Sequence, residues 1–514
     1  MLYILILLLF MVLLKKGKVN QGENKTLQRR LKDLCASREC WKAKAKARRI
    51  ENKALKKRIQ ELSQSRDNWK VKSQQNQAEL EQRARELKEI QRASKQKQQK
   101  ETPKNHHYSL LVIRLAVMVK LQTSASFRAI GKLVVILQIQ FHLLTESPTH
   151  TTVANWVYKI GYYELTRPKE QADDWIVLLD HSIQLGQDKL FVVLGIRESQ
   201  IDFTRPLNYQ DLTPFVITSK TSWNGDKVCA SLKALEKKIG TINYAVGDHG
   251  SELKKGLQLA NIRQIHDITH AIALMLEKLY KTDEIYHDLT SRMSTMRTKY
   301  SQSQLASIIP PKQRKKSRYQ NIKTISDWAH NALRVLESVS VQHTEEALHI
   351  QEALEWICSY KTCIDELATI NTVICQVEQI VKCYGLSNDT VKQCRRILKK
   401  LSKCSGSKGA VLKKQLEHYF QTALKLIHES KQLICTSDIV ESAFGKYKNY
   451  LSANPIVGVT KLALVIAAFT SKLNKHEIKE ALENTSMKDI KRWTEEHIGT
   501  TLFSRRKLLL SGCL

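Results

Sequence analysis

The stretch from residue 241 to residue 270 reads TINYAVGDHGSELKKGLQLANIRQIHDITH. Its apolar run, residues 242–246, is typical of a buried strand, and the Gly-Asp-His-Gly that follows is typical of a turn. A helix and then a second short strand, residues 262–265, are predicted after that turn. Each of the two strands is therefore followed closely by an acidic residue, Asp248 after the first and Asp267 after the second.

A third strand of this kind lies upstream. Residues 175–179 are continuously apolar and are predicted to form a strand that ends on Asp180 and His181. In open α/β sheets, ligands and metals bind at the carboxyl ends of the strands. An isolated acidic residue after a strand is usually a turn residue or a helix cap, and that alternative stands for each of the three taken alone.

Several carboxylates gathered at one edge would carry a specific chemistry. They repel one another unless cations neutralise them, which is the situation in two-metal phosphoryl-transfer sites, where the metals lie about 3.5–4 Å apart. Oxygen ligands of this type suit Mg²⁺ or Mn²⁺.

The composition indicates a polyanionic partner. The chain has 514 residues, a formal net charge of +33 and a sequence pI near 9.7, with 42% hydrophobic residues. This length allows about three domains with a sizeable core. A large chain this basic most often binds nucleic acid, and an acidic membrane surface is the competing interpretation. The eleven cysteines contain no CxxC pair, which indicates reduced thiols in an intracellular protein rather than a zinc site.

The first 20 residues form an apolar N-terminal segment. Residues 2–14 are almost wholly apolar, but about 13 residues fall short of the roughly 17–25 that span a bilayer. A signal-like segment, a marginal anchor and a start codon placed too early, with Met11 as the true start, all remain open. We expect no membrane partner.

Residues 21–102 are predicted to form a basic coiled coil. Neither Gly nor Pro occurs between Thr26 and Lys100, and Arg48 interrupts an otherwise regular seven-residue apolar series. The series consists of Leu27, Leu34, Trp41, Leu55, Leu62 and Trp69. The pattern favours dimerisation together with attraction to phosphates, and the alternative is a solvated basic helix without a partner.

Residues 108–165 are predicted to form a helix-turn-helix-like DNA-binding domain. Its third helix, expected to start at Ser147-Pro148, has an apolar stripe made of Val153, Trp156, Val157 and Ile160. The opposite face carries Thr151, Asn155 and Tyr158, with Lys159 beside it. Short hydrogen-bonding side chains backed by a packed face are what a recognition helix offers a major groove. The alternative is a helical triplet without DNA contact.

The remaining chain divides into an α/β part and helical parts. Residues 174–270 are expected to follow the order β-β-β-α-β-α-β and to form the first part of a core. Residues 271–436 are expected to be an all-helical insertion, residues 437–470 to supply the final helices of the core, and residues 471–514 to form a basic helical tail. Glu441, Gly445 and Lys448 fall on one helix face by their spacing. The alternative role for Glu441 is a capping box with Asp438.

This order of motifs resembles the DDE transposases of the RNase H-like superfamily, of the insertion-sequence type. In that family a first Asp follows the first strand, a second follows the fourth, and a Glu lies on a late helix, as Asp180, Asp248 and Glu441 do here. The sequence Asp267-Ile268-Thr269-His270 resembles the C/D-x-x-H signature. Glu441 and Lys448 are similar to the last two members of a Y-R-E-K pattern, whose first two positions hold Ile434 and Ser437 here.

The resemblance implies an α/β RNase H-like catalytic core with an all-α insertion, preceded by a helical DNA-binding domain and an N-terminal coiled coil. Two Mg²⁺ (or Mn²⁺) ions would be held by Asp180, Asp248 and Glu441. Asp267 and His270 would support the site from its rim, and Lys448 would neutralise a phosphate.

The activity implied is that of a DNA transposase, which catalyses metal-dependent strand cleavage and strand transfer at the ends of a mobile element. Its partners would be the double-stranded DNA of the element ends and of the target. It would act as a homodimer or a higher homo-oligomer in the cytoplasm, associated with the nucleoid. Two alternatives stay open: a catalytically inactive, domesticated DNA-binding protein, and an RNase H-like nuclease.

Overall fold

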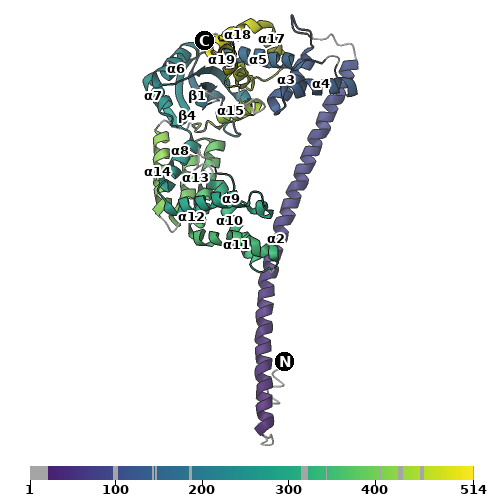
Figure 1. The fold of residues 1–514 in the computed structure, drawn as a ribbon, viewed down its shortest axis with the longest axis vertical. Helices are drawn as coiled ribbons and strands as arrows, with labels where there is room; N and C mark the ends of the chain where they lie inside the picture. The colour runs from purple at the N-terminus through teal and green to yellow at the C-terminus, as the bar shows by residue number, and fades with distance from the viewer. Residues whose placement is uncertain are drawn as a thin grey trace. The chain divides into compact units, whose positions relative to one another are not determined.

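The computed structural model describes most of the chain, and its contacts divide the chain into two units, residues 1–99 and 100–514 (Figure 1). The described residues are 21–95, 102–141, 144, 147–183, 188–313, 322–342, 344–403, 407–425, 432–451 and 457–512. The apolar segment predicted at residues 1–20 lies outside them. Within the described ranges, no helix combines the length and the apolar character needed to cross a membrane.

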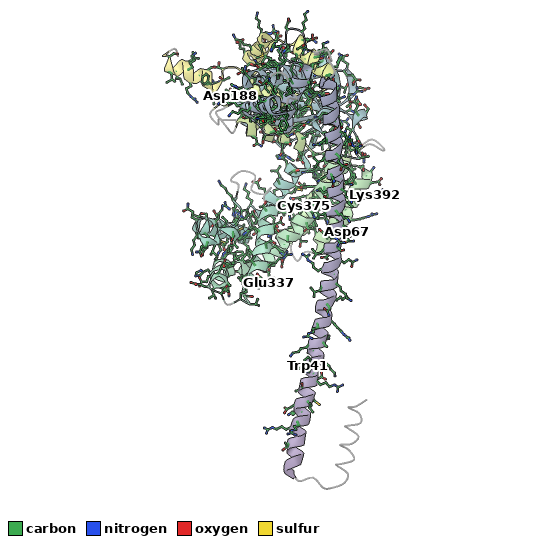
Figure 2. The ribbon with its side chains drawn as sticks, turned by 90° about the vertical axis from the view of Figure 1, so that its right-hand side faces the viewer. Trp41, Asp67, Asp188, Glu337, Cys375 and Lys392 are labelled. Carbon is green, nitrogen blue, oxygen red and sulfur yellow. The ribbon has the colours of Figure 1, made fainter. Side chains whose placement is uncertain are left out.

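The first unit is a single helix, α2, which runs over Gln21–Lys95. Lys, Arg, Glu, Gln, Ala and Leu dominate it, and these residues favour helix on propensity alone. The members of its seven-residue apolar series from Leu34 onward are exposed, with Leu34 at 61% and Trp41 at 63% accessible, and Trp41 projects from the helix in Figure 2. The predicted helix is confirmed. The coiled-coil partner stays a prediction.

The second unit contains a five-stranded mixed sheet of order β3-β2-β1-β4-β5. β1 pairs antiparallel with β2, as does β2 with β3, whereas the β1–β4 and β4–β5 pairs are parallel. The predicted order β-β-β-α-β-α-β is the observed one. Its elements are β1 (Ala172–Ile183), β2 (Lys189–Arg197), β3 (Thr213–Lys220), α6 (Gly225–Ile239), β4 (Gly240–Gly247), α7 (Ser251–Ala260) and β5 (Gln264–His266).

β1 does not end at Asp180, as the apolar run had suggested. It continues to Ile183 because the antiparallel β2 keeps pairing with it, and Asp180 lies opposite Val192. The parallel pairing with β4 stops earlier, at Leu178 and Val246. Asp180 and Asp248 each follow that last pair by two residues. Both therefore lie just beyond the carboxyl end of the parallel pairing, Asp180 still within β1 and Asp248 in the turn after β4.

The side chains of β1 alternate between two hydrophobic layers, as the two-residue period of a strand requires. Ile176 and Leu178 belong to the larger core on one face of the sheet. Val177 and Leu179 belong to a smaller core on the other face, which α6 and α7 cover (Figure 1). All four are fully buried, which explains why this segment reads as a continuous apolar run: both faces of the strand are covered.

The predicted helical triplet is present as α3 (Leu110–Gln122), α4 (Phe127–Phe141) and α5 (His150–Thr166). α5 begins two residues later than predicted, because Thr149 is its N-cap: the Thr149 hydroxyl accepts a hydrogen bond from the Thr152 amide. The apolar stripe of α5 is buried as expected. Gly161 permits the close approach of α16 (Leu464–Ala468), since a Cβ there would lie 2.1 Å from the Leu464 carbonyl oxygen.

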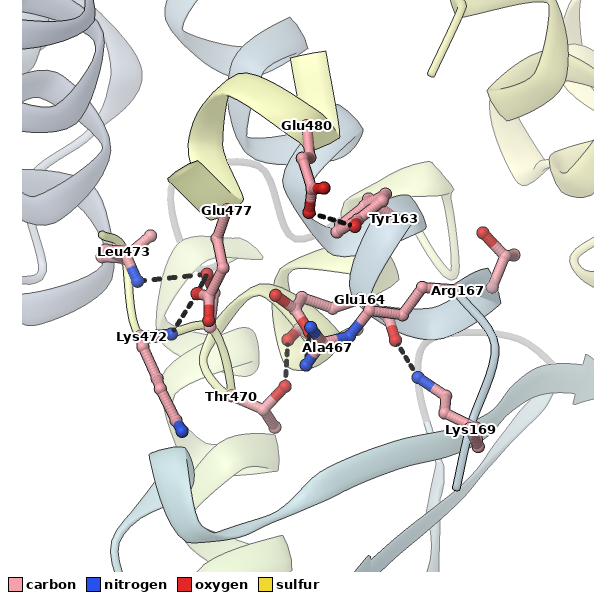
Figure 3. Close-up of polar contacts among 12 residues, drawn as sticks. Tyr163, Glu164, Arg167, Lys169, Ala467, Thr470, Lys472, Leu473, Glu477 and Glu480 are labelled. Atoms are coloured by element: carbon pink, nitrogen blue, oxygen red, sulfur yellow. Dashed lines mark hydrogen bonds and ion pairs between the residues drawn. The ribbon is translucent and has the colours of Figure 1, made fainter. Parts of the chain in front are cut away.

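Polar contacts fasten α5 to the C-terminal helices (Figure 3). The Tyr163 hydroxyl donates to Glu480 Oε2 at 2.8 Å, whereas the buried Glu164 pairs locally with Arg167, the C-cap of α5, at 2.8 Å. Glu480 belongs to α17 (Lys475–Asn484), which packs on α5 together with α18 (Met487–His497). Residues 471–497 are therefore part of the main core and not a separate tail. Only α19 (Leu502–Leu510) of the described C-terminal helices buries no residue.

The segment predicted as an all-helical insertion is helical, with one isolated bridge between Leu386 and Leu433. Its helices gather into one group (Figure 1): α8 (Ile268–Tyr280), α9 (Glu284–Tyr300), α10 (Ile322–Val339), α11 (Glu345–Leu354), α12 (Lys361–Tyr384), α13 (Asn388–Leu398) and α14 (Ser407–Leu424). Lys408 on α14 bridges Asp283 at 2.6 Å and Glu366 at 2.9 Å. α15 (Asp438–Leu451) then returns the chain to the sheet.

Short 3₁₀ helices complete the fold. They are η1 (Glu198–Gln200), η2 (Tyr209–Asp211), η3 (Gln304–Ile308), η5 (Glu355–Tyr360), η6 (Lys399–Lys403) and η7 (Lys461–Ala463).

Candidate active site at the carboxyl edge of the sheet

Asp180 lies half-buried among negative charges. Burial, followed by the charges of Asp248 and Glu441, raises the pKa of Asp180 to about 7. The His181 amide, which donates to Asp180 Oδ1 at 2.6 Å, and the Lys448 ammonium oppose this shift. The charges of two carboxylates that follow Asp180 by 68 and 261 residues therefore act on it at this edge of the sheet.

Asp248 is held by the turn that follows β4. The Gly250 amide donates to Asp248 Oδ1 at 2.8 Å, and the Gln264 side chain donates to the Asp248 carbonyl oxygen at 3.0 Å. A Cβ at Gly250 would lie 2.9 Å from Asp248 Oδ1. The absence of a side chain at residue 250 therefore lets the loop fold back onto the carboxylate.

Glu441 contacts the histidine of the Asp267-to-His270 motif. His270 Nε2 and Glu441 Oε1 are 2.5 Å apart and form a hydrogen bond. Burial raises the pKa of Glu441, helped by Asp267 and Asp438 and opposed by His270 and Lys382. Among the described residues no hydrogen bond joins Glu441 to Asp438, whose amide instead donates to the Thr436 hydroxyl at 3.2 Å. The capping-box alternative for Glu441 is therefore wrong.

Asp267 joins α8 to the start of α15. It is fully buried and caps α8 by accepting from the His270 amide at 3.0 Å through Oδ1. Its Oδ2 accepts from the Ser437 amide at 2.6 Å and from the Ser437 hydroxyl at 3.1 Å. Both carboxylate oxygens are thus used inside the protein, and they fix the helix that carries Glu441.

A second contact to α15 comes from α12 and was not foreseen from the sequence. Lys382 Nζ lies 2.8 Å from Asp438 Oδ2, at the first residue of α15. Glu378, one turn before Lys382, adds its negative charge to the factors that raise the pKa of Lys382. The signal in the sequence was a Glu and a Lys four residues apart beside the buried Val377 and Val381.

The helix face that carries Glu441 is open toward solvent. A Cβ at Gly445 would meet nothing within 4 Å, and Lys448 is exposed. Lys448 is close enough to Asp180 to lower its pKa. The face therefore combines a carboxylate, an unobstructed backbone and a cation, an arrangement that can accept an anionic group.

The donor chemistry at this edge fits a hard divalent cation, although the ligands are not gathered. Across the described part of the chain, no three His, Cys, Asp or Glu side chains stand close enough together to hold a metal ion. Burial and the charges of the other two carboxylates still oppose the ionisation of Asp180, so positive charge at this edge would be favourable.

The structure separates the four residues predicted to bind DNA into two pairs. Thr151 is exposed and Asn155 is half-exposed in the first two turns of α5. Tyr158 packs edge-on against Phe127, and burial raises its pKa to about 12. Lys159 Nζ donates to the Leu482 carbonyl oxygen at 3.1 Å and contacts His106. The second pair therefore holds α5 in its place within the protein.

Two histidines adjacent to the aspartates occupy different surroundings. His181 packs against the rings of Phe191 and Trp223, which also contact each other, and burial lowers the pKa of His181 to about 4. His249 is exposed and stacks on His266, with ring centroids 3.8 Å apart. Neither side chain contacts Glu441 directly in the described structure.

Comparison with known proteins adds a distant structural likeness. No protein-family model matches the sequence, and no curated protein matches it. Among solved structures, the chain is similar to the Drosophila P element transposase strand transfer complex, with 13% identity over 71% of this chain and 92% of that chain. The TM-score is 0.36, a level at which the likeness decides neither fold nor function.

Proposed function

We propose that this chain is a DNA transposase of the DDE type, which cleaves and joins DNA strands at the ends of a mobile element. One observation carries the proposal: Glu441, 193 residues beyond Asp248, returns on α15 to the strand ends that bear the two aspartates, and its charge acts on Asp180. The mixed sheet of order β3-β2-β1-β4-β5, with the element order of an RNase H-like sheet, supports this assignment.

Asp180, Asp248 and Glu441 would hold two Mg²⁺ or Mn²⁺ ions, which would supply a nucleophile at neutral pH and stabilise the leaving oxygen. The carboxylates are the binding groups for these ions. Cation binding would also offset the burial and the repulsion by Asp248 and Glu441 that together raise the pKa of Asp180 to about 7.

The neighbouring residues position these groups. Asp267 fixes the start of α15 through Ser437, and His270 orients Glu441 through their hydrogen bond. Lys448, on the open face of α15, would bind a DNA phosphate beside Glu441. Lys382 anchors the same helix from α12.

The N-terminal end of α5 would read the DNA sequence. Recognition helices contact base edges with their N-terminal residues, and Thr151 and Asn155 are the predicted readers that remain accessible there. Tyr158 and Lys159 would support the helix from behind. The net charge of +33 would supply the nonspecific part of the affinity, and it fits nucleoid association.

Helix α2 would make the protein a homodimer or a higher homo-oligomer. The apolar series is exposed from Leu34 to Trp69 on a helix of 75 residues. Isolated helices obtain little stability without burying an apolar face. Pairing of two α2 helices would cover the series.

The test is DNA cleavage by Glu441→Gln in Mg²⁺, with the element-end duplex as substrate. Loss of a supporting residue at a metal site lowers activity by roughly 10- to 100-fold. We expect Glu441→Gln to keep DNA binding and to lose more cleavage activity than that range. His270→Ala should fall within that smaller range. The control Glu495→Gln changes an exposed glutamate on α18 and should cleave normally.

The two alternatives give other results. Wild-type protein that binds the DNA without cleaving it would favour the inactive, domesticated relative. Cleavage without joining of the 3′ end to a target duplex would favour a nuclease.

A further inference from the structure

The loop between β2 and β3, residues 201–212, reaches the turn of α15 that carries Glu441. The hydroxyl of Tyr209, which lies on η2 in this loop, donates a hydrogen bond to Ser442 Oγ at 2.8 Å. Ser442 directly follows Glu441 in the sequence. A residue 233 positions before Ser442 therefore contacts α15 beside the carboxylate that is proposed to bind metal.

The ring of Tyr209 makes a second contact with the same helix. Lys446 lies four residues after Ser442, so the two side chains share one face of α15. The Lys446 ammonium lies 4.5 Å from the centroid of the Tyr209 ring and 5.2 Å from that of Phe469, and these two rings are 5.3 Å apart. A cation over aromatic faces is attracted to them. Tyr209 therefore holds this face of α15 through both its hydroxyl and its ring.

The turn that carries Tyr209 is itself held in shape. The Arg205 guanidinium donates to both carboxylate oxygens of Asp211, at 2.7 Å and 2.8 Å. The Asn208 amide donates to Asp211 Oδ2 at 2.8 Å. Bidentate pairs between arginine and a carboxylate are geometrically specific. Tyr209 thus projects from a preorganised support rather than from a freely folding loop.

The rotation of α15 about its own axis needs a contact of this kind. The inner face of the helix is buried and consists of Val440, Ala443, Phe444 and Tyr447. Apolar burial is non-directional, so this face determines which side of α15 points inward without fixing the angle closely. On the open face, a Cβ at Gly445 would meet nothing within 4 Å. The directional contact between Tyr209 and Ser442 lies between these two faces.

A small rotation of α15 would displace the Glu441 carboxylate. Side chains extend to about 5–6 Å from the axis of a helix, so a rotation of about 10–20° moves a group at that radius by about 1–2 Å. Functional groups must be held to within about 0.5 Å and 10–20° of their working geometry. A misplacement of about 1 Å can lower a rate about 100-fold.

We infer that Tyr209 is a positioning residue, which fixes the rotation of α15 through Ser442 and so places the Glu441 carboxylate. The inference rests on the proposed function, because that function makes Glu441 a metal-binding group. Tyr209 acts through the helix and not through a bond to DNA or to an ion. The loss of its contacts should therefore lower the rate of cleavage without weakening the binding of DNA.

The first experiment measures steady-state cleavage of the element-end duplex by full-length protein in Mg²⁺. Tyr209→Phe and Ser442→Ala each remove the same neutral hydrogen bond, and each should lower kcat by about 2- to 5-fold with KM for DNA unchanged. The double variant should be no slower than either single variant, because one interaction is lost in all three. Tyr209→Ala also loses the ring and should lower kcat about 10- to 100-fold.

The second experiment measures hydrogen exchange of the peptide 440–447 in protein without divalent metal. Tyr209→Phe should make this peptide exchange about 2- to 5-fold faster, the factor that corresponds to one neutral hydrogen bond. Ser442→Thr, which keeps a hydroxyl, should retain the wild-type exchange and kcat. The matched control is Tyr384→Phe, which alters an exposed tyrosine at the end of α12 and should change neither measurement.

The outcomes separate the positioning role from the proposed function. An unchanged kcat for Tyr209→Phe, or losses that multiply in the double variant, would overturn the positioning role while cleavage by the wild-type protein continues to support the proposed function. A raised KM with an unchanged kcat would instead make Tyr209 a DNA contact. Wild-type protein that binds the duplex without cleaving it would overturn the proposed function, and exchange of the peptide 440–447 would still decide whether Tyr209 fixes α15.

Discussion

The change Asp267→Asn tests whether the buried aspartate positions α15 rather than binding metal. Asn can still cap α8, because Asn and Asp are about equally good N-caps. Its amide nitrogen, however, would replace Oδ2 and face the Ser437 amide, which donates to that oxygen at 2.6 Å. The variant therefore removes one charge-assisted hydrogen bond and sets two donors against each other.

The size of the effect follows from that bond. Hydrogen bonds to charged groups contribute about 1.5–3 kcal/mol. A loss of about 2 kcal/mol in local stability corresponds to roughly 30-fold faster hydrogen exchange of the Ser437 amide, if local opening governs exchange. Asp267→Ala also loses the cap, which is worth about 1 kcal/mol more, so its exchange should be about 150-fold faster.

The assay is native-state hydrogen exchange resolved to the peptide that contains Ser437, together with DNA cleavage in Mg²⁺. Cleavage by Asp267→Asn should fall about 10- to 100-fold, as for loss of a supporting group at a metal site. The control Asp389→Asn alters an exposed aspartate that pairs with Lys392 on α13 and should change neither measurement. Exchange at Ser437 that rises less than about threefold, with cleavage abolished, would refute the positioning role and indicate a metal ligand.

Four further predictions concern stability and assembly. Burial raises the pKa of Glu164. The stability that its protonated carboxyl contributes is therefore fully present below the unfolded pKa and is lost as the pH rises through the folded pKa. Glu164→Gln should flatten this pH dependence of the free energy of unfolding, as measured by denaturant titrations between pH 4 and 8. Gly161→Ala should destabilise the protein by about 1–3 kcal/mol in the same titration at fixed pH, because its Cβ would meet the Leu464 carbonyl oxygen at 2.1 Å. Lys408→Met should cost about 3 kcal/mol, since it leaves two carboxylates without their shared cation; an unchanged unfolding midpoint would contradict this. Leu62→Asp in the exposed series of α2 should convert the oligomer to monomers by light scattering, whereas an unchanged mass would exclude α2 as the interface.

The α/β core could be predicted from the sequence because its signals are local. Four of the five residues in 242–246 are apolar, Asn243 being the exception, because both faces of their strand are covered. The Gly-Asp-His-Gly that follows favours a turn. The order of strands and helices followed from such runs. The stripe from Val153 to Ile160 likewise identified the buried face of α5 before its partners were known.

The sequence by itself also brought forward Asp180, Asp248 and Glu441 as candidates, because residue type and position after a strand or early in a helix are visible in one dimension. Their common location depended on the tertiary fold. Nothing local determines where α15 lies after a helical segment of more than 150 residues, and the contacts that settle it, from Asp267 to Ser437 and from Lys382 to Asp438, join segments far apart in the chain.

The tertiary structure alone likewise decided the surroundings of α5 and of the histidines. Tyr158 and Lys159 share a helix face with Asn155 by periodicity, yet residues more than 300 positions later, such as Leu482, cover part of that face. The stacking of His249 on His266 and the unpaired Gln415 oxygen were equally beyond the reach of the sequence. Periodicity specifies which side chains lie on the same face of one helix or strand. The burial and the hydrogen-bond partners of that face depend on which distant elements pack against it.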